Sequence, residues 1–356
     1  MKLYHFSQQG KRSNNEDSLG TSAGLFTVCD GMGGHIAGER ASGFVKEAML
    51  KAFAEPKPLG KMEIQQQLNQ VQADLNQLLE KEPELEKMGT TFTGVFITPD
   101  VWYAAHIGDS RIYLFRPSEQ KLWHTWDHSL VGELMRTKEI TVEAGRFHPM
   151  SNRISKAIIA QKDGKLASAS IVKIDELKAG DILLLCSDGV VEAWGDWELV
   201  QLFSDESLGF EQKCKQLAQR CNEKSKDNNT AIIAEIEEKD AFSYGTNEEL
   251  EWTTFDEVDA DYQQYLKDNE KVKEVHKAQE NKPAQKEETS PNAESEKEPM
   301  AKDNLQKPLD KTKKPYIKPS TSSSSQQEGK PKRKKSLWVV ILFIVVAAVV
   351  AYFFLK

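Results

Sequence analysis

Three runs of alternating apolar and polar residues follow one another between residues 90 and 115, and the breaks between them are very short. The runs cover 90–97, 101–107 and 110–115, and the breaks hold the turn-forming pairs Pro99-Asp100 and Gly108-Asp109. Such a break can join antiparallel strands as a hairpin, whereas a parallel pair needs a crossover of a dozen residues or more. The sequence therefore predicts an antiparallel sheet.

Helices are expected in pairs between the strand-like runs. Apolar residues recur at three- and four-residue spacing over 37–53 and 61–82, and a further helical stretch begins near Trp197. Short apolar runs predict additional buried strands at 25–29, 170–174, 181–186 and 230–236. Because the strands cluster and the helices come in pairs, the pattern favours an α+β fold over an alternating α/β fold.

Five short acidic segments lie in turn-like text, several of them directly after a strand-like run. They cover 12–17, 30–35, 108–111, 181–189 and 227–230, and they include Asp17, Asp30, Asp109, Asp188 and Asp227. Carboxylate oxygens are ligands that suit Mg²⁺ or Mn²⁺ rather than zinc. Two such ions held by converging carboxylates can neutralise a phosphate monoester and activate water. The segments therefore predict a metal site that acts on phosphate.

The order and spacing of these segments resemble a known family. The blocks are GKRSNNED (10–17), DGMGGHIAGE (30–39), MGTT (88–91), GDSR (108–111), DHS (127–129), GDILLLCSDG (180–189) and DNNT (227–230). Together they resemble the signature blocks of metal-dependent Ser/Thr protein phosphatases of type 2C, the PPM family, and DGMGGH is similar to the bacterial branch. The resemblance covers roughly residues 1–238. It implies a central sandwich of two antiparallel sheets flanked by helix pairs, with the metal cluster at one edge.

The resemblance also implies a centre of two divalent ions, Mg²⁺ or Mn²⁺, with a third and weaker one in bacterial relatives. The implied ligands are Asp17, Asp30, Gly31, Asp188, Asp227 and Asp109. Asp30 would bridge the two principal ions, and the main-chain carbonyl that follows it would ligate one of them. Asp109 and Asp188 would share the third ion. Asp17 would anchor metal-bound water, and Glu16 is an additional contact.

Two further residues are implied to act on the substrate. Arg12 matches the arginine that grips the phosphate, and its planar fork of donors fits two phosphate oxygens. A hydroxide held by the metals would then attack phosphorus without a phosphoenzyme. His35 either serves as general acid for the leaving alcohol or caps the following helix. Both alternatives stay open because Met32 stands where some family members carry a histidine.

Three other features of the sequence bear on the family resemblance. The block at 152–159 has Lys156 where the family has Arg and Ile159 where it has Gly. This block lies in a polar stretch, 127–165, that we expect to form a flap over the site, so the two departures concern the geometry of that flap. Residues 214–220 satisfy the C-x5-R spacing of cysteine-dependent phosphatases. Since Cys214, Leu217, Ala218 and Cys221 share one helical face, they predict a core helix instead. All four cysteines lack CxxC spacing and agree with a reducing compartment.

The composition changes sharply after the catalytic part. We expect a phosphatase domain at 1–239, a disordered polar linker at 240–335 and a transmembrane helix at 337–355, which is nineteen residues without a charge. Residues 311–335 hold nine Lys or Arg against one Glu, a net of +8, so the N-terminal part is expected to stay cytoplasmic. The N-terminus shows no apolar stretch typical of a signal peptide. For the acidic, aromatic segment 242–265, two alternatives stay open. It is either part of the solvated linker, or a segment that docks a partner or covers the cleft of the predicted metal site.

These observations predict a hydrolase: a protein serine/threonine phosphatase, anchored to the cytoplasmic face of the cell membrane by its C-terminal helix. The alternative is a non-catalytic phosphoprotein-binding membrane scaffold, a pseudophosphatase. The expected partners are phosphorylated proteins, the lipid bilayer and, by the family resemblance, a membrane Ser/Thr kinase. Since the whole chain carries −8, the basic stretch +8 and Lys356 one more, residues 1–310 carry −17. That charge argues against nucleic acid as a partner.

Overall fold

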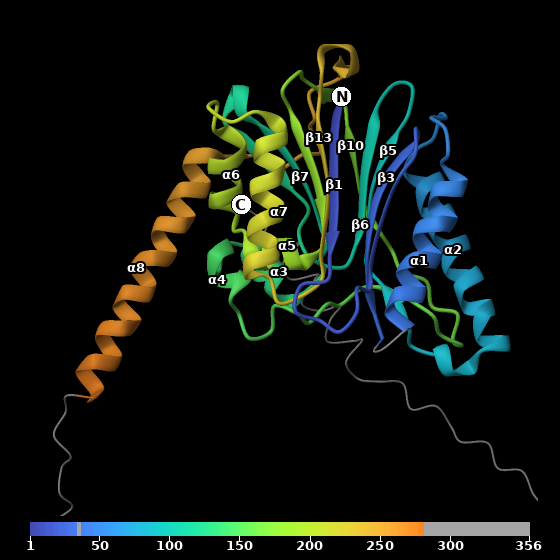
Figure 1. The fold of residues 1–356 in the computed structure, drawn as a ribbon, viewed down its shortest axis with the longest axis horizontal. Coiled ribbons are helices and arrows are strands. Elements are labelled where there is room, and N and C mark those ends of the chain that lie inside the picture. The colour runs from blue at the N-terminus through green and yellow to red at the C-terminus, as the bar shows by residue number, and fades with distance from the viewer. Residues whose placement is uncertain (34–36, 281–356) are drawn as a thin grey trace, which may run out of the picture. The chain divides into compact units, whose positions relative to one another are not determined.

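Two antiparallel sheets lie face to face in the centre of the protein (Figure 1). The structure is a computed structural model of the chain, and it describes residues 1–33 and 37–280. The first sheet has the strand order β1-β13-β12-β7-β8-β15. Its strands are β1 (Lys2–Gln8), β7 (Arg111–Arg116), β8 (Lys121–His124), β12 (Ile182–Cys186), β13 (Asn229–Glu235) and β15 (Thr253–Thr254).

The second sheet has the order β10-β6-β5-β3-β4-β9, and β2 pairs with β3 beside this path. Its strands are β2 (Asp17–Thr21), β3 (Leu25–Met32), β4 (Gly89–Thr90), β5 (Phe92–Ile97), β6 (Trp102–Ile107), β9 (Ile158–Ile159) and β10 (Ser170–Ile174). A small separate sheet joins β11 (Glu176–Leu177) to β14 (Phe242–Ser243). Strands β5, β6 and β7 confirm the three strand-like runs, and β5 and β6 form the predicted antiparallel hairpin. The prediction is wrong for the second break, because β7 pairs with β8 and β12 in the first sheet, so the turn at Gly108-Asp109 leads from one sheet to the other.

The apolar core between the sheets comes from every second residue of the facing strands. In β12, Leu183 and Leu185 point into the sandwich, while Leu184 and Cys186 belong to the core under the outer helices. Successive side chains of a strand point to opposite faces, so a strand covered on both sides is apolar throughout. This explains why residues 182–186 read as one unbroken apolar run.

Helices cover the outer face of each sheet (Figure 1). The second sheet is covered by α1 (Ala37–Ala52) and α2 (Lys61–Lys81). The first is covered by α5 (Asp188–Ala193), α6 (Asp196–Ser204) and α7 (Phe210–Lys224). The α+β sandwich with flanking helices is thus confirmed. Cys214, Leu217, Ala218 and Cys221 are buried on α7, so the C-x5-R spacing does belong to a core helix.

The stretch at 127–165, predicted to be a flap, carries two short helices. These are α3 (Leu130–Arg136) and α4 (Val142–Arg146). Each begins with a capping side chain, since Ser129 accepts a hydrogen bond from the Gly132 N–H and Thr141 accepts one from the Ala144 N–H. The segment therefore has local order of its own.

The prediction of disorder from residue 240 onward is wrong for residues 242–280. Strands β14 and β15 pair with β11 and β8, and α8 (Phe255–Glu280) packs against α4 and α6. The aromatic residues that punctuate this polar segment supply the contacts, as Tyr262 stacks on Trp197 with ring centroids 4.7 Å apart. The rest of the predicted linker and the predicted transmembrane segment 337–355 lie outside the described residues. Among the helices that the structure describes, none is long and apolar enough to cross a membrane.

Candidate active site

The acidic segments meet at one end of the sandwich, where the strands that carry them begin or end. Asp17 opens β2 and lies directly opposite Asp30 of β3. Asp109 lies in the turn between β6 and β7, Asp188 opens α5 directly after β12, and Asp227 precedes β13. Residues that are up to 210 positions apart in the sequence are thus brought to one place by strand pairing, as their clustering at strand ends predicted.

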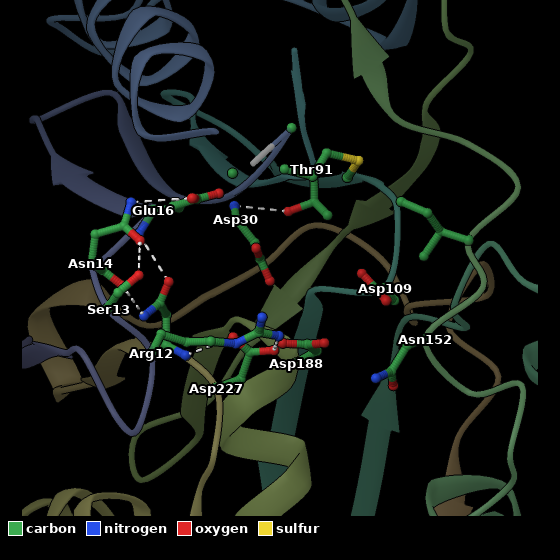
Figure 2. A pocket seen from close by; sticks show the side chains of 15 residues that line it. Arg12, Ser13, Asn14, Glu16, Asp30, Thr91, Asp109, Asn152, Asp188 and Asp227 are labelled. Atoms are coloured by element: carbon green, nitrogen blue, oxygen red, sulfur yellow. Dashed lines mark hydrogen bonds and ion pairs between the residues drawn. The ribbon is translucent and has the colours of Figure 1, made fainter. Parts of the chain in front are cut away.

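A cavity of about 570 Å³ lies between these segments. Figure 2 shows the carboxylates of Asp30, Asp109 and Asp188 directed into a common space, with Arg12 and Asp227 along one side. Gly31 and Glu16 also line the cavity. Asp17 does not line it but lies behind the lining, 8% exposed. The structure therefore brings together all the predicted metal ligands, with Asp17 in an outer position.

Three uncharged polar residues that the sequence interpretation did not single out hold this arrangement. Ser187 donates to Asp17 Oδ2 at 2.7 Å and accepts the Thr230 N–H at 3.0 Å. Thr91 Oγ1 accepts the N–H of Asp30 at 3.0 Å. The third is Asn228. Ser187 and Asn228 lie within blocks that contain a site aspartate and Thr91 ends the MGTT block, so the family-like blocks were the available signal.

Asn228 fastens the loop between β1 and β2 to the start of β13. Its amide nitrogen donates to the main-chain oxygens of Gln9 and Asn14, both at 2.8 Å, and its amide oxygen accepts the Glu16 N–H at 2.9 Å. Gly10 has a φ of +61°, and a Cβ there would lie 2.0 Å from the main-chain oxygen of Asp227. Only glycine allows this close passage, which places Arg12 beside Asp227.

The GDSR and DHS blocks are joined by a buried ion pair. Arg111 is 3% exposed, and its Nε and one terminal nitrogen donate to the two carboxylate oxygens of Asp127 at 2.6 and 2.8 Å. Another nitrogen donates to the Tyr113 hydroxyl at 3.0 Å. The parallel fork of donors and acceptors is a strong, directional arrangement. It fixes the strand that directly follows Asp109.

Burial, and after it the charge of neighbouring carboxylates, raises the pKa values of four aspartates at the site. Burial, together with the nearby charge of Asp227, raises the pKa of Asp17 to about 6. Burial and the charge of Asp127 raise that of Asp109 to about 7. The pKa values of Asp30 and Asp188 lie well above the usual range, first because of burial and then because of neighbouring carboxylates. Concentrated negative charge of this kind favours a bound cation.

The donor set fits divalent metal ions of the oxygen-binding class. Asp17 Oδ1 and Asp188 Oδ1 are buried and have no hydrogen-bond partner among the described residues. Buried acceptors without partners are costly unless something else satisfies them. Within residues 1–33 and 37–280, no three His, Cys, Asp or Glu side chains already surround a single point as a metal cage. The site is therefore an open cavity lined by carboxylates, with the unpartnered Asp188 Oδ1 in its lining and the unpartnered Asp17 Oδ1 behind it.

Arg12 reaches the cavity from the loop between β1 and β2. One of its terminal nitrogens pairs with Asp227 Oδ2, an interaction that raises the pKa of the guanidinium. The side chain is 57% exposed, so its other donors face solvent at the cavity rim. His35, the other predicted substrate residue, lies outside the described residues.

The comparisons with known proteins agree with this geometry. The sequence profile described as protein phosphatase 2C matches residues 7–234. The chain belongs to the protein phosphatase 2C family. Residues 7–234 therefore form a phosphatase domain, which confirms the predicted enzyme class at the level of the domain.

Bacterial proteins are among the curated and solved relatives of this phosphatase domain. Serine/threonine protein phosphatase PstP of Mycobacterium tuberculosis is 32% identical over 232 residues, which are 64% of this chain but only 43% of that protein. The chain thus spans less than half the length of PstP. Serine/threonine phosphatase stp of Listeria innocua is 30% identical over 63% of this chain and 91% of its own. The crystal structure of Stp1 from Staphylococcus aureus superposes with a TM-score of 0.57 at 30% identity, covering 66% of this chain and 95% of that one.

Proposed function

We propose that the protein is a serine/threonine protein phosphatase that hydrolyses phosphoserine and phosphothreonine esters with the help of divalent metal ions. The observation that carries this proposal is the convergence of Asp30, Asp109, Asp188 and Asp227 with Arg12 on one cavity. An anionic phosphate could not enter so acidic a cavity without cations. The residues present therefore suit a metal-dependent reaction better than metal-free acid–base catalysis.

Mg²⁺ or Mn²⁺ is the proposed cofactor, and support comes from a related structure, the catalytic domain of PstP in complex with two manganese ions. In this chain, Asp30, Asp188, Asp227 and the Gly31 carbonyl would hold two ions, and Asp109 would help to hold a third. Asp17 would act from behind the cavity lining. When bound, the ions supply positive charge to the phosphate and lower the pKa of water toward neutrality.

The chain's own residues orient the substrate. Arg12 carries a fork of donors at the cavity rim, and in the proposed complex it turns these donors to two phosphate oxygens. Its ion pair with Asp227 limits how far the guanidinium can move. Arg12 would thus present the phosphorus atom to the carboxylate-lined interior, while the polypeptide of the substrate stays outside.

The direct test is hydrolysis of p-nitrophenyl phosphate and of a phosphothreonine peptide by residues 1–280 with Mn²⁺, Mg²⁺ or EDTA. Asp30→Asn is expected to remove activity, and Asp100→Asn, in an exposed turn between β5 and β6, is the matched control. Full activity of Asp30→Asn would contradict the metal mechanism. Binding of the phosphopeptide without turnover under any divalent ion would instead favour the pseudophosphatase scaffold, which the complete set of carboxylates does not favour.

Membrane anchoring and a membrane Ser/Thr kinase as partner are further parts of the proposal. Support comes from the uncharged run at 337–355 and the basic residues 332–335 in front of it. The full chain is expected in the membrane fraction after a carbonate wash, and a chain ending at residue 330 in the soluble fraction. Equal partition of both chains would refute the anchor. Protection of the phosphatase domain from protease added outside intact cells tests its cytoplasmic orientation.

A further inference from the structure

A second cavity of about 610 Å³ opens from the first. The two cavities share five lining residues, Arg12, Asp109, Asn152, Asp188 and Asp227. One wall of the second cavity is formed by the end of α4 and the residues after it, including Phe147 and His148, and the opposite wall by α5. A phosphorylated residue of a protein substrate enters the first cavity with polypeptide on both sides of it. The adjoining cavity can therefore accommodate the substrate residues on one of these sides.

The α4 wall of the second cavity is supported by α3 and α8, which pack against α4. Helix α4 itself has only five residues. On α8, Asp261 Oδ2 accepts the main-chain N–H of Val142 at 2.9 Å and so fixes the first turn of α4. Tyr265 stacks against Phe147, with ring centroids 6.1 Å apart and 24° between the rings. The ring of Phe147 thus contacts α8 while the same residue lines the second cavity.

Helix α8 is itself firmly attached to the domain. Tyr262 stacks on Trp197 of α6 at 4.7 Å, and the Trp197 indole N–H donates to Asp259 at 2.9 Å. Its first residue, Phe255, donates its N–H to the Gln120 main-chain oxygen. Helix α8 lies outside the matched family region 7–234, so this support for the wall is an addition to the family domain.

We propose that α8 positions the α4 wall of the second cavity for the polypeptide flank of the substrate, with Asp261 and Tyr265 as positioning residues. This inference rests on the proposed phosphatase function. It assigns to residues 255–265 a part in selecting protein substrates over small phosphate esters. The phosphate itself would be handled by the first cavity, which α8 does not line.

The test compares two substrates, p-nitrophenyl phosphate and a phosphothreonine peptide of about ten residues, with Mn²⁺ and residues 1–280. In Asp261→Ala and Tyr265→Ala the peptide KM is expected to rise about tenfold, a change equivalent to about 1.4 kcal/mol. The kinetic constants for the aryl phosphate are expected to stay within twofold. Tyr265→Phe keeps the ring and should restore the peptide KM. Asp268→Ala, at an exposed position on the same helix, is the matched control.

Amide hydrogen exchange of residues 142–148 supplies a readout that does not depend on turnover. Exchange is expected to accelerate in Asp261→Ala and to stay unchanged in Asp268→Ala. The inference would be overturned by unchanged amide exchange or by an unchanged peptide KM in Asp261→Ala. An equal loss of activity on both substrates would also overturn it, because such a loss indicates general damage to the fold. If the parent protein hydrolyses neither substrate, the phosphatase proposal fails on its own. The role of α8 is then tested by the Kd for the phosphothreonine peptide, and an unchanged Kd in Asp261→Ala would overturn that role.

Discussion

Replacing Asp17 with asparagine is expected to stabilise the metal-free protein. The Asp17 carboxylate is 8% exposed and its Oδ1 atom has no partner among the described residues. Its pKa rises to about 6, because of burial and then of Asp227, against about 3.9 in an unfolded chain. A difference of about two pKa units corresponds to roughly 3 kcal/mol of destabilisation at a pH where the group is ionised. Asparagine has the same shape, keeps an acceptor for Ser187 and carries no charge.

The pH dependence gives this prediction its sign. Because the folded-state pKa lies above the unfolded one, the folded protein holds the proton more tightly. The penalty is therefore absent below about pH 4, reaches about half its size near pH 5 and is complete above about pH 6. At pH 8 with EDTA, Asp17→Asn should raise the midpoint of thermal unfolding by roughly 6 to 12 °C, and much less at pH 5.

Mn²⁺ is expected to narrow this difference in stability between variant and parent, because an ion bound only by the folded state at 100 times its Kd adds about 2.7 kcal/mol. The parent protein should gain this stabilisation in full at pH 8 and the variant only in part. Differential scanning fluorimetry and urea titration measure both effects, with Asp100→Asn as the control. A variant that is less stable than the parent at pH 8 without metal, or a difference that does not change with pH, would refute the reasoning.

Three further outcomes are expected. Arg111→Met leaves the Asp127 charge unpaired and should lower the unfolding free energy, measured in urea, by about 3 to 5 kcal/mol. A loss below about 1 kcal/mol would count against a tight buried ion pair. Gly31→Ala places a Cβ 2.2 Å from the Gly38 main-chain oxygen, so it should abolish both activity and Mn²⁺-dependent stabilisation, and a fully active variant would disprove this. Burial raises the pKa of Cys29 to about 12, so iodoacetamide at pH 8 should label it only after unfolding, and mass spectrometry after brief exposure of the native protein checks this.

The strands and the acidic cluster were predictable because both depend on local pattern. The short break beside Pro99-Asp100 predicted a hairpin, and β5 and β6 pair in this way. The hairpin predicted at Gly108-Asp109 is wrong, because β7 pairs with β8 and β12 in the other sheet, and a local pattern cannot show that a turn leads from one sheet to the next. An aspartate directly after a buried run, such as Asp188, must lie at a strand end. Once the strands pair, the strand ends meet. The common location of the predicted metal ligands follows from this pairing.

The order in residues 242–280 could not be read from the sequence. The segment is rich in Glu, Asp and Gln, and such a composition usually buries too little apolar surface to fold by itself. It is ordered here because a few aromatic residues, such as Tyr262 and Tyr265, meet partners on α6 and after α4. Those partners are distant in the sequence, at Trp197 and Phe147. The same holds for Asn228, whose three hydrogen bonds join segments more than 200 residues apart.

The pairing of β1 with β13 determines when the active-site cavity can first form during synthesis on the ribosome. The first strand is matched residue by residue with the last strand of the family domain, from Lys2 with Glu235 to Gln8 with Asn229. A nascent chain that ends before β13 leaves β1 without a neighbour and one edge of β12 unpaired, and such open strand edges favour aggregation. It also lacks Asp227 beside Arg12. Prematurely terminated products are therefore expected to be unstable and also to lack a complete active-site cavity.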